Sequence, residues 1–476
     1  NALDHDHPGA ALLPVAALGR YGQPAISGHR DGRAFTVAFE RVSVEETADC
    51  LVLTSHDAVA GLDLAVTIRR AGPDAFAQSL TITNRGADAY TLERAMAGVF
   101  LAPPGTDTAL TFSGSWGREF RETREPLGTA VFVKENRRGR LSHDRWSSVI
   151  VGPSGLSEAA GAALGVHLAW SGNHTLLIEP LDDGRRLVMV GELFHPGEMR
   201  LAPGATYQSP EAYAAVCDTG LDGLADRFHA TVRADVLTLD PARPRPVTLN
   251  TWEGTYFDHK LDDLIAQAHA AAAIGIERFV LDDGWFGRRD DDTTSLGDWA
   301  IDPRKYPEGL GPLVDAVTSL GMEFGIWFEP EMVNPVSDLY RAHPEWVLKV
   351  DGRPLETGRN QLVLNIARPE VSDYLFQAVD AVLSRYKVAY VKWDMNRDHF
   401  ASGDAEGRAV YGAQVRALYA LLDRLKAAHP TVEFESCSSG GGRVDLAILR
   451  RTARVWTSDC TDALERASIQ RGVSRF

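Results

Sequence analysis

The sequence is poor in cysteine and in positive charge, and it contains no long apolar run. Its 476 residues include only four cysteines, Cys50, Cys217, Cys437 and Cys460, which form no close pairing motif. This usage is typical of a reducing compartment rather than of a disulfide framework, so we expect a cytoplasmic location. No stretch approaches the roughly 18 consecutive apolar residues of a membrane helix, and a membrane is therefore not expected as a partner.

The shortage of positive charge narrows the choice of partners. Lysine and arginine number 49 against 65 aspartate and glutamate residues, which leaves a formal net charge of −16. The field of such a chain repels phosphate groups, so nucleic acid is a poor partner and a neutral substrate is favoured. The sequence has neither the cysteine–histidine spacing of a zinc site nor the pattern of a phosphate loop, and we expect no metal and no cofactor.

Residues 1–240 have the pattern of an antiparallel β-sandwich. Large apolar residues occupy every second position from Leu62 to Ile68, as in a strand with one buried face. The segments HTLLIEP and RRLVMVG flank Asp182-Asp183-Gly184, which predicts a hairpin because glycine tolerates a positive φ angle. Short runs of this kind, separated by turn residues, favour an all-β domain.

Residues 241–476 change to an alternation of strand and helix patterns. Amphipathic helical stripes end at Gly275 and Gly321, between apolar runs that end in polar or aromatic residues. Because every strand carries such residues at its carboxyl end, we expect a (β/α)8 TIM barrel rather than an open sheet. Only six strand units fit before residue 476, so the barrel is expected to be incomplete. The six runs are VTLNTW, RFVLDDGW, EFGIWFEP, AYVKWD, EFESCSS and RVWTSD.

Two aspartates at strand ends are the candidates for catalysis. Asp394 ends the run AYVKWD, and Lys392 points to the same side of that strand, where its charge keeps the aspartate ionised. Asp459 ends the run RVWTSD, two strands further along. Two carboxylates on one rim suit glycoside hydrolysis, in which one attacks or activates water and the other protonates the leaving oxygen. Metal binding and helix capping stay open as alternatives for each.

Further polar and aromatic residues end the other strands. Asp282 and Asp283 either accept hydrogen bonds from sugar hydroxyls or form a strand-end turn. Glu329 and Glu331 are either ligands or salt-bridge partners, and Glu329 with the two aspartates would also suit a metal-dependent hydrolase. Flat indole rings that could pack on a pyranose stand at Trp252, Trp285, Trp327 and Trp393.

Seven motifs follow one another along the chain: LDDGWFGRRDDD, SLGDW, WFEPEMV, GRNQLVLN, YVKWDMNR, ESCSSGGGR and WTSDCTDA. Together they resemble the successive motifs of glycoside hydrolase family 36, whose best-known members are retaining α-galactosidases. The resemblance also extends back to Gly114–Phe120 and Arg137–His143. Seven ordered motifs are far more specific than any one of them.

The resemblance implies a role for each candidate residue. Asp394 would be the nucleophile that forms a covalent galactosyl-enzyme, and Asp459 would protonate the leaving oxygen and then activate water. Other residues would hold the galactose hydroxyls, line the space beside the 2-hydroxyl or wall the sugar pocket. These substrate-binding residues would be Trp252, Asp282, Asp283, Trp327, Arg359, Lys392, Cys437 and Gly440.

The resemblance therefore implies a retaining α-galactosidase that hydrolyses terminal α-linked galactose from oligosaccharides of the raffinose and melibiose type. Galactosyl transfer of the raffinose-synthase type, or sugar binding by a catalytically incompetent fragment, are the alternatives. Members of the family are longer, so we expect this chain to lack the N-terminal start, the last barrel strands and a C-terminal β-domain. The full-length enzyme is expected to be a homo-oligomer.

Overall fold

The computed structural model describes residues 12–18, 22–240 and 242–476, which form two compact units. The first unit extends to Leu237 and also includes Val444–Ile448 and Cys460–Phe476. The second unit consists of Thr238–Arg443 and Leu449–Asp459. The sequence-based domains, 1–240 and 241–476, stay a prediction, and Pro241 itself lies outside the described residues. No helix in the described part of the chain is long and apolar enough to cross a membrane.

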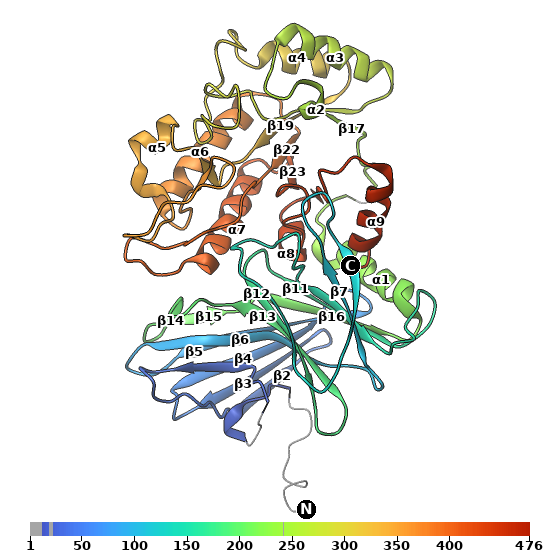
Figure 1. The fold of residues 1–476 in the computed structure, drawn as a ribbon, viewed down its shortest axis with the longest axis vertical. Helices are drawn as coiled ribbons and strands as arrows, with labels where there is room; N and C mark the ends of the chain where they lie inside the picture. Colours follow the sequence, from blue (N-terminus) through green and yellow to red (C-terminus); the bar gives the residue numbers. More distant parts are fainter. Residues whose placement is uncertain (1–11, 19–21, 241) are drawn as a thin grey trace, which may run out of the picture. The chain divides into compact units, whose positions relative to one another are not determined.

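The first unit is built on two antiparallel sheets (Figure 1). The strands are β1 Ile26–His29, β2 Glu40–Glu46, β3 Cys50–Asp57, β4 Leu62–Arg70, β5 Ala75–Asn84, β6 Tyr90–Leu101, β7 Thr108–Ser113, β8 Arg121–Pro126, β9 Phe132–Asn136, β10 Ser148–Gly152, β11 Ala163–Ala169, β12 His174–Pro180, β13 Arg186–Leu193, β14 Met199–Leu201, β15 Thr206–Gln208 and β16 Glu211–Cys217. One sheet has the order β1-β6-β13-β12-β9, with β14 beside β6. The other has the order β2-β3-β4-β5-β16-β11-β10-β7-β8, with β15 beside β5. The predicted antiparallel sandwich is confirmed.

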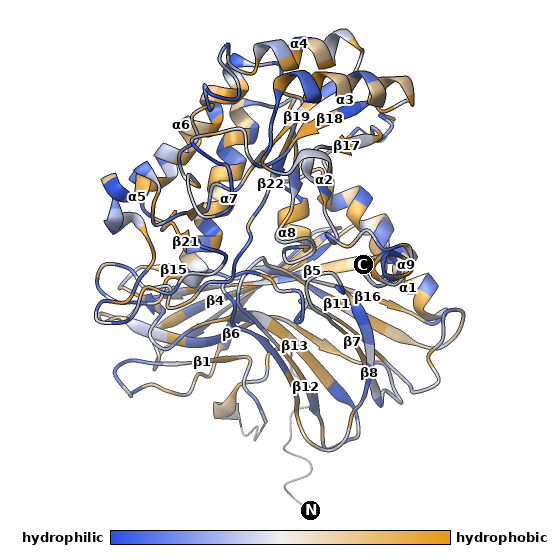
Figure 2. Ribbon diagram, turned by 45° about the horizontal axis from the view of Figure 1, so that its top comes forward, coloured by the Kyte–Doolittle hydropathy of each residue, from blue (hydrophilic) through white to orange (hydrophobic). Residues whose placement is uncertain are grey.

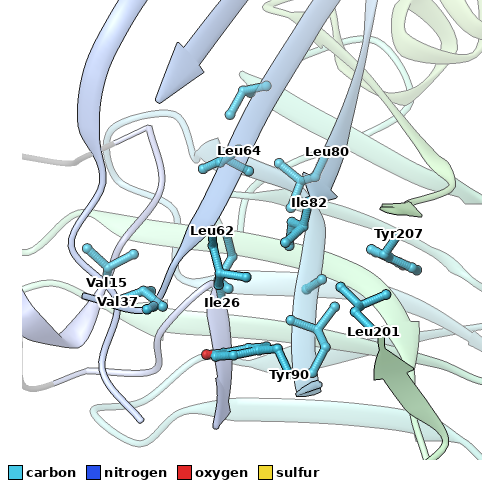
Figure 3. Packing of buried hydrophobic residues seen from close by; sticks show 14 of the residues in the cluster. Val15, Ile26, Val37, Leu62, Leu64, Leu80, Ile82, Tyr90, Leu201 and Tyr207 are labelled. Carbon is cyan, nitrogen blue, oxygen red and sulfur yellow. The ribbon is translucent and has the colours of Figure 1, made fainter. Parts of the chain in front are cut away.

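The core of this unit follows from the predicted alternation along β4. Leu62, Leu64 and Val66 are buried at every second position, while the residues between them are half-buried. Figure 3 shows Leu62 and Leu64 packing with Leu80 and Ile82 of β5 in one apolar cluster. In Figure 2 the central strands β11 and β16 are hydrophobic, whereas β8, at the edge of its sheet, is more hydrophilic.

The predicted hairpin at Asp182-Asp183-Gly184 is also confirmed. Strands β12 and β13 pair antiparallel from His174–Glu192 to Pro180–Arg186. Gly184 takes a φ angle of 82° in the turn, a conformation that side chains with a Cβ adopt at a cost.

In its described part the first unit also contains the helical segments η2 Ala16–Leu18, α1 Gly220–Thr231, η3 Val232–Val236, α9 Ala463–Val473 and most of the short α8 Leu446–Leu449. Just after α9, the side chain of Arg475 is buried between two glutamates. Its Nε donates to Glu122 at 2.6 Å, and its Nη1 donates to Glu158 at 2.6 Å. These ion pairs are among the contacts that join Cys460–Phe476 to the first unit.

The second unit is a parallel sheet whose strand order, β17-β18-β19-β22-β23-β24, is the order of the chain. All neighbouring strands in it are parallel, so the predicted incomplete barrel of six strand units is confirmed. Its elements are β17 Thr248–Asn250, α2 Trp252–Thr255, α3 Leu261–Ala273, β18 Arg278–Leu281, α4 Gly311–Ser319, β19 Glu323–Phe328, β20 Met332–Val333, α5 Asp338–Ala342, η4 Pro344–Trp346, β21 Leu362–Val363, α6 Pro369–Arg385, β22 Tyr390–Trp393, α7 Tyr411–Ala428, β23 Glu433–Ser436 and β24 Arg454–Val455. A short helix, α8 Leu446–Leu449, precedes β24.

The register of this sheet brings polar side chains to one side. Trp327 of β19 lies beside Lys392 of β22, which lies beside Glu435 of β23. Side chains two positions further along a strand share the same side, so Asp394 and Cys437 follow on that side at the carboxyl ends. The sheet thereby places the residues singled out by the sequence at one edge.

The ion pairs of Arg475 make the stability of the first unit depend on pH. The pKa of Glu158 is lowered from its usual 4.5 to about 2, first by the hydrogen bond from Arg475. A carboxyl whose folded pKa is depressed stabilises the fold above its unfolded pKa, and this contribution is lost as pH falls through the folded value. Between about pH 6 and about pH 3 we therefore expect the protein to lose more stability than its Glu158→Gln variant in urea unfolding. Equal losses would contradict the assignment.

Candidate active site

Asp394 follows β22 directly, and its carboxylate is buried. Its Oδ2 accepts hydrogen bonds from the indole Nε1 of Trp327 at 3.1 Å and the side-chain amide of Asn396 at 2.8 Å. Its Oδ1 accepts from the backbone N–H groups of Met395 at 2.8 Å and Ser439 at 3.3 Å. These four donors fix the rotation of the carboxylate about its side-chain bonds.

A cation keeps this buried carboxylate ionised. Burial by itself raises the pKa of Asp394, yet its pKa is lowered, because the Lys392 ammonium and hydrogen bonds from Cys437 and Asn396 outweigh burial. In turn burial lowers the pKa of Lys392, but the charges of Asp282 and Asp394 raise it well above its usual value. Lys392 and Asp394 are therefore both charged at neutral pH.

Asp282, at the end of β18, is the direct ion-pair partner of Lys392. Its Oδ2 lies 3.0 Å from the lysine Nζ and also accepts a hydrogen bond from the amide of Asn250 in β17. The hydroxyl of Thr251 accepts from its backbone N–H at 3.0 Å. Two other segments of the sheet, β17 with Thr251 after it and β22, thus hold Asp282, and the charge of Lys392 is shared between Asp282 and Asp394.

Asp283 has a cation of its own. The guanidinium of Arg289 binds it through Nε–Oδ1 at 2.9 Å and Nη2–Oδ2 at 2.8 Å. Arg289 is in turn held by the side chain of Asn334 and the carbonyl of Thr294. Burial raises the pKa of Asp283 in spite of this pair. Both oxygens of Asp283 thus already accept hydrogen bonds from the protein.

The half-buried Lys305 fastens the loops around these aspartates. Lys305 donates to the carbonyls of Phe257 at 2.9 Å, Gly284 at 2.9 Å and Arg289 at 2.7 Å. Gly284 directly follows Asp283 and has a φ angle of 117°. A Cβ at this position would stand 3.2 Å from the Cα of Phe257, so only glycine allows the two loops to approach so closely.

Cys437 and Asp459 complete the set at the ends of β23 and β24. The pKa of the buried Cys437 thiol is raised well above its usual value by burial and by the charges of Asp394 and Asp459. Both predicted catalytic carboxylates therefore act on one thiol. Asp459 is half-buried and accepts a hydrogen bond from Nε1 of Trp456 at 2.9 Å. Gly440, with a φ of 75°, lies in the buried loop after Cys437.

The four tryptophans of the predicted rim have different surroundings. Trp327 is bonded to Asp394, and Trp252 is half-buried with its ring edge against Tyr256 and Phe257. Trp285 and Trp393 are buried like Trp327, but they donate to the carbonyl oxygen of Trp327 and to Glu331, respectively, rather than to Asp394. Their hydrogen bonds therefore belong to the core, whereas that of Trp327 reaches Asp394.

Arg359 is exposed, with a φ angle of 51°, and its charge partly opposes the rise that burial causes in the pKa of the nearby Glu329. The two glutamates that the sequence left undecided differ. Glu331 forms a buried ion pair with Arg443 at 2.8 Å, whereas no ion pair of Glu329 occurs among the described residues. Glu329 instead accepts hydrogen bonds next to Asp394.

Several functional neighbours escape a reading of the sequence alone. Asn250 binds Asp282 from 32 residues away in the sequence. Arg289 binds Asp283 from 6 residues away, and Lys305 binds the carbonyl of Gly284 from 21 residues away. Asn396 could have been found from the sequence, because it follows Asp394 by two positions and so points to the same side of the chain. Asn250 and Lys305 carried no such signal, because only the folded sheet brings their segments to the aspartates. Arg289 lies in the same loop as Asp283, but the sequence does not show whether Arg288 or Arg289 binds this aspartate.

Among the described residues no group of three or more histidine, cysteine, aspartate or glutamate side chains could hold a metal ion. Asp282 and Asp283 are matched by Lys392 and Arg289 instead. The chemistry that the arrangement offers is that of an oriented, ionised carboxylate beside a second carboxylate.

The Lys305 contacts predict a loss of stability when its ammonium is removed. Lys305→Met leaves three carbonyls without their charged donor, which we expect to lower the unfolding free energy by about 2–4 kcal/mol. Lys260, an exposed lysine paired with exposed Asp258, is the matched control, and Lys260→Met should leave stability unchanged. Urea unfolding measures both, and equal stability of the two variants would contradict the fastening role.

Comparison with known proteins covers almost all of the chain. Residues 2–202 match the model of the glycosyl hydrolase family 36 N-terminal domain, and residues 206–476 match the model named Melibiase. An alpha-galactosidase of Escherichia coli is 45% identical, covering 100% of this chain and 66% of its own. Alpha-galactosidase AgaA of Geobacillus stearothermophilus is 38% identical, covering 91% of this chain and 60% of its own. This chain thus spans less than two thirds of the length of these relatives.

Solved structures agree with these sequence matches. The crystal structure of the family 36 alpha-galactosidase AgaA from Geobacillus stearothermophilus superposes with a TM-score of 0.92 at 34% identity, over 97% of this chain and 68% of that one. The alpha-galactosidase of Lactobacillus brevis superposes with a TM-score of 0.91 at 34% identity, over 97% and 66%.

Proposed function

Because this chain belongs to glycoside hydrolase family 36, we propose that the whole protein is a retaining α-galactosidase that removes terminal α-linked galactose from oligosaccharides. The galactosidase names of the relatives support this activity. Variants of AgaA form crystalline complexes with stachyose and with raffinose, which supports substrates of the raffinose and melibiose type.

The observation that carries the proposal is the buried, ionised carboxylate of Asp394. In the first step one of its oxygens attacks the anomeric carbon while the glycosidic bond breaks, and the leaving oxygen takes a proton from Asp459. Pre-formed hydrogen bonds from Trp327 and Asn396 orient the attacking group, so little reorganisation is needed on the way to the transition state.

Asp459 acts again in the second step. As a carboxylate it takes a proton from water, and the water oxygen attacks the anomeric carbon, which releases Asp394 and galactose in the original configuration. The half-buried position of Asp459 suits this role, because both a leaving group and water must reach it. In retaining glycosidases the nucleophile and the acid/base carboxyl groups lie about 5–5.5 Å apart, and we expect this separation between Asp394 and Asp459.

The remaining predicted residues would recognise the sugar. Asp282 and Lys392 would bind galactose hydroxyls directly, and Asp283 would do so with Arg289 as its counter-ion. Trp252 and Trp327 would form walls of the pocket, with Arg359 at its exposed side. Cys437 and Gly440 would lie beside the 2-hydroxyl, where they leave no room for an N-acetyl group, so galactose is preferred over N-acetylgalactosamine.

Hydrolysis is favoured over the predicted alternatives, transfer of the raffinose-synthase type and sugar binding without catalysis, because the relatives are named galactosidases. We further propose a cytoplasmic location, which the four free cysteines support, and a homo-oligomeric full-length enzyme, which only the family resemblance supports.

Removing the nucleophile should abolish turnover without unfolding the protein. Asp394→Asn keeps the size of the side chain but replaces the anion, and we expect hydrolysis of a nitrophenyl α-galactoside to fall by about 10³-fold or more. Asp262→Asn, on the exposed side of α3, is the matched control and should keep full activity. Hydrolysis at the wild-type rate by the Asp394 variant would refute the assignment.

The stereochemistry of the product tests the two-step mechanism separately. When the protein cleaves an α-galactoside inside an NMR tube, double displacement releases α-galactose first, and the β-anomer grows only by mutarotation. Early release of β-galactose would show a single displacement and would overturn the role of Asp394 as the attacking group.

A further inference from the structure

Glu329 is a buried carboxyl, 1% exposed, next to the proposed nucleophile, and the reaction described above does not use it. It follows β19, two residues before Glu331. Glu331 is explained by the core, since it pairs with Arg443 and accepts from Trp393. Glu329 forms no ion pair among the described residues, so charge neutralisation does not account for its burial.

The hydrogen bonds of Glu329 lead to Asp394. Its Oε1 accepts from the backbone N–H of Asn396 at 2.5 Å, and its Oε2 accepts from the side-chain amide of Gln361 at 3.1 Å. The side-chain amide of the same Asn396 donates to Oδ2 of Asp394 at 2.8 Å. One residue thus connects the two carboxyl groups, through its backbone on one side and its side chain on the other.

The side chain of Asn396 is constrained from its other end as well. Its Oδ1 accepts a hydrogen bond from the hydroxyl of Ser439 at 3.0 Å, which fixes which end of the amide is turned to Asp394. With Ser439 holding the amide and Glu329 holding the backbone, Asn396 has one orientation in which it can donate to Asp394. A shift of its backbone would tilt this donor and leave Oδ2 of Asp394 with Trp327 as its remaining side-chain donor.

Burial, together with the charge of Asp394, keeps Glu329 neutral at pH 7. Burial and the negative charge of Asp394 raise its pKa to about 8, against the opposing charges of Arg359 and Arg289. These groups come from β22, the loop before β21 and the loop after β18, and Arg289 is also paired with Asp283. Of these two neighbouring carboxyl groups, Asp394 is therefore the charged one and Glu329 the neutral one.

We propose that Glu329 is a positioning residue, which acts on Asp394 through Asn396. This inference rests on the proposed function, because it assigns to Glu329 the orientation of the attacking carboxylate. Glu329 does not touch the substrate in this proposal. Its carboxyl holds Asn396 in place, and when it ionises it puts a second negative charge beside the carboxylate that must leave in the second step.

A double-variant cycle in the intact protein tests the connection. Glu329→Ala should lower kcat for a nitrophenyl α-galactoside by about 10- to 100-fold with KM changed less than about threefold, because orientation rather than binding is lost. In the Asn396→Ala background the same substitution should cost less than about threefold, since the connecting amide is already absent. If the loss of kcat in the double variant equals the product of the losses in the two single variants, the residues act independently and the proposal is overturned.

Glu329→Gln provides a test if the alanine variant does not fold. Glutamine keeps an oxygen to accept from Asn396 but cannot ionise, so kcat near pH 7 should stay within about threefold of wild type. An activated dinitrophenyl α-galactoside needs no proton from Asp459, which makes the second step limiting. The wild-type kcat should then fall as Glu329 ionises, at about pH 8 or below, because Asp394 carries no charge in the covalent intermediate. The glutamine variant should not show this fall.

Superposable pH profiles of the wild type and Glu329→Gln would overturn the role of Glu329. Failure of the proposed function has a different signature, in which the wild type itself cleaves no α-galactoside. A wild type that is active, with additive losses in the cycle, refutes only the inference about Glu329.

Discussion

The ion pair between Lys392 and the carboxylates above it is the constraint on which the site depends. A carboxylate removed from water must find a cation or take up a proton. Asp282 and Asp394 share the ammonium of Lys392, and Asp283 has the guanidinium of Arg289. Glu329, which has neither, is kept neutral. The site therefore holds several carboxyl groups close together because each has its own way of balancing charge.

The strands below the site continue this charged packing. Arg278, in β18, is buried between Glu323 of β19 and Glu433 of β23, with its guanidinium 4.4 Å from the ring centre of Tyr390. One level higher, Glu435 lies beside Lys392 in the register. Opposite charges on neighbouring parallel strands thus support the sheet in layers, and the uppermost layer ends at the carboxyl edge where Asp394 stands.

Much of this arrangement could be predicted because it is local. Helix α3 ends near Gly275, whose φ of 88° is the left-handed conformation expected of glycine at such a position. The alternation along β4 defined its buried face, and Lys392 and Asp394 share a side of β22 by the period of a strand. The same local rule could not show which tryptophan belongs to the site. Trp327 donates a hydrogen bond to Asp394, whereas Trp393 donates to Glu331 in the core.

The sequence by itself determined the two kinds of sheet, the parallel order of the second one, and the identity of the ionisable groups at its carboxyl edge. These features depend on periodicities of a few residues, which are present in the sequence whether or not the chain is folded. Only the tertiary structure decided that Asp283 is bound by Arg289, that Lys305 fastens two loops through three carbonyls, and that Glu329 reaches Asp394 through Asn396. Those contacts depend on the depth of burial and on segments that meet only after the strands have paired, and no spacing in the sequence encodes either.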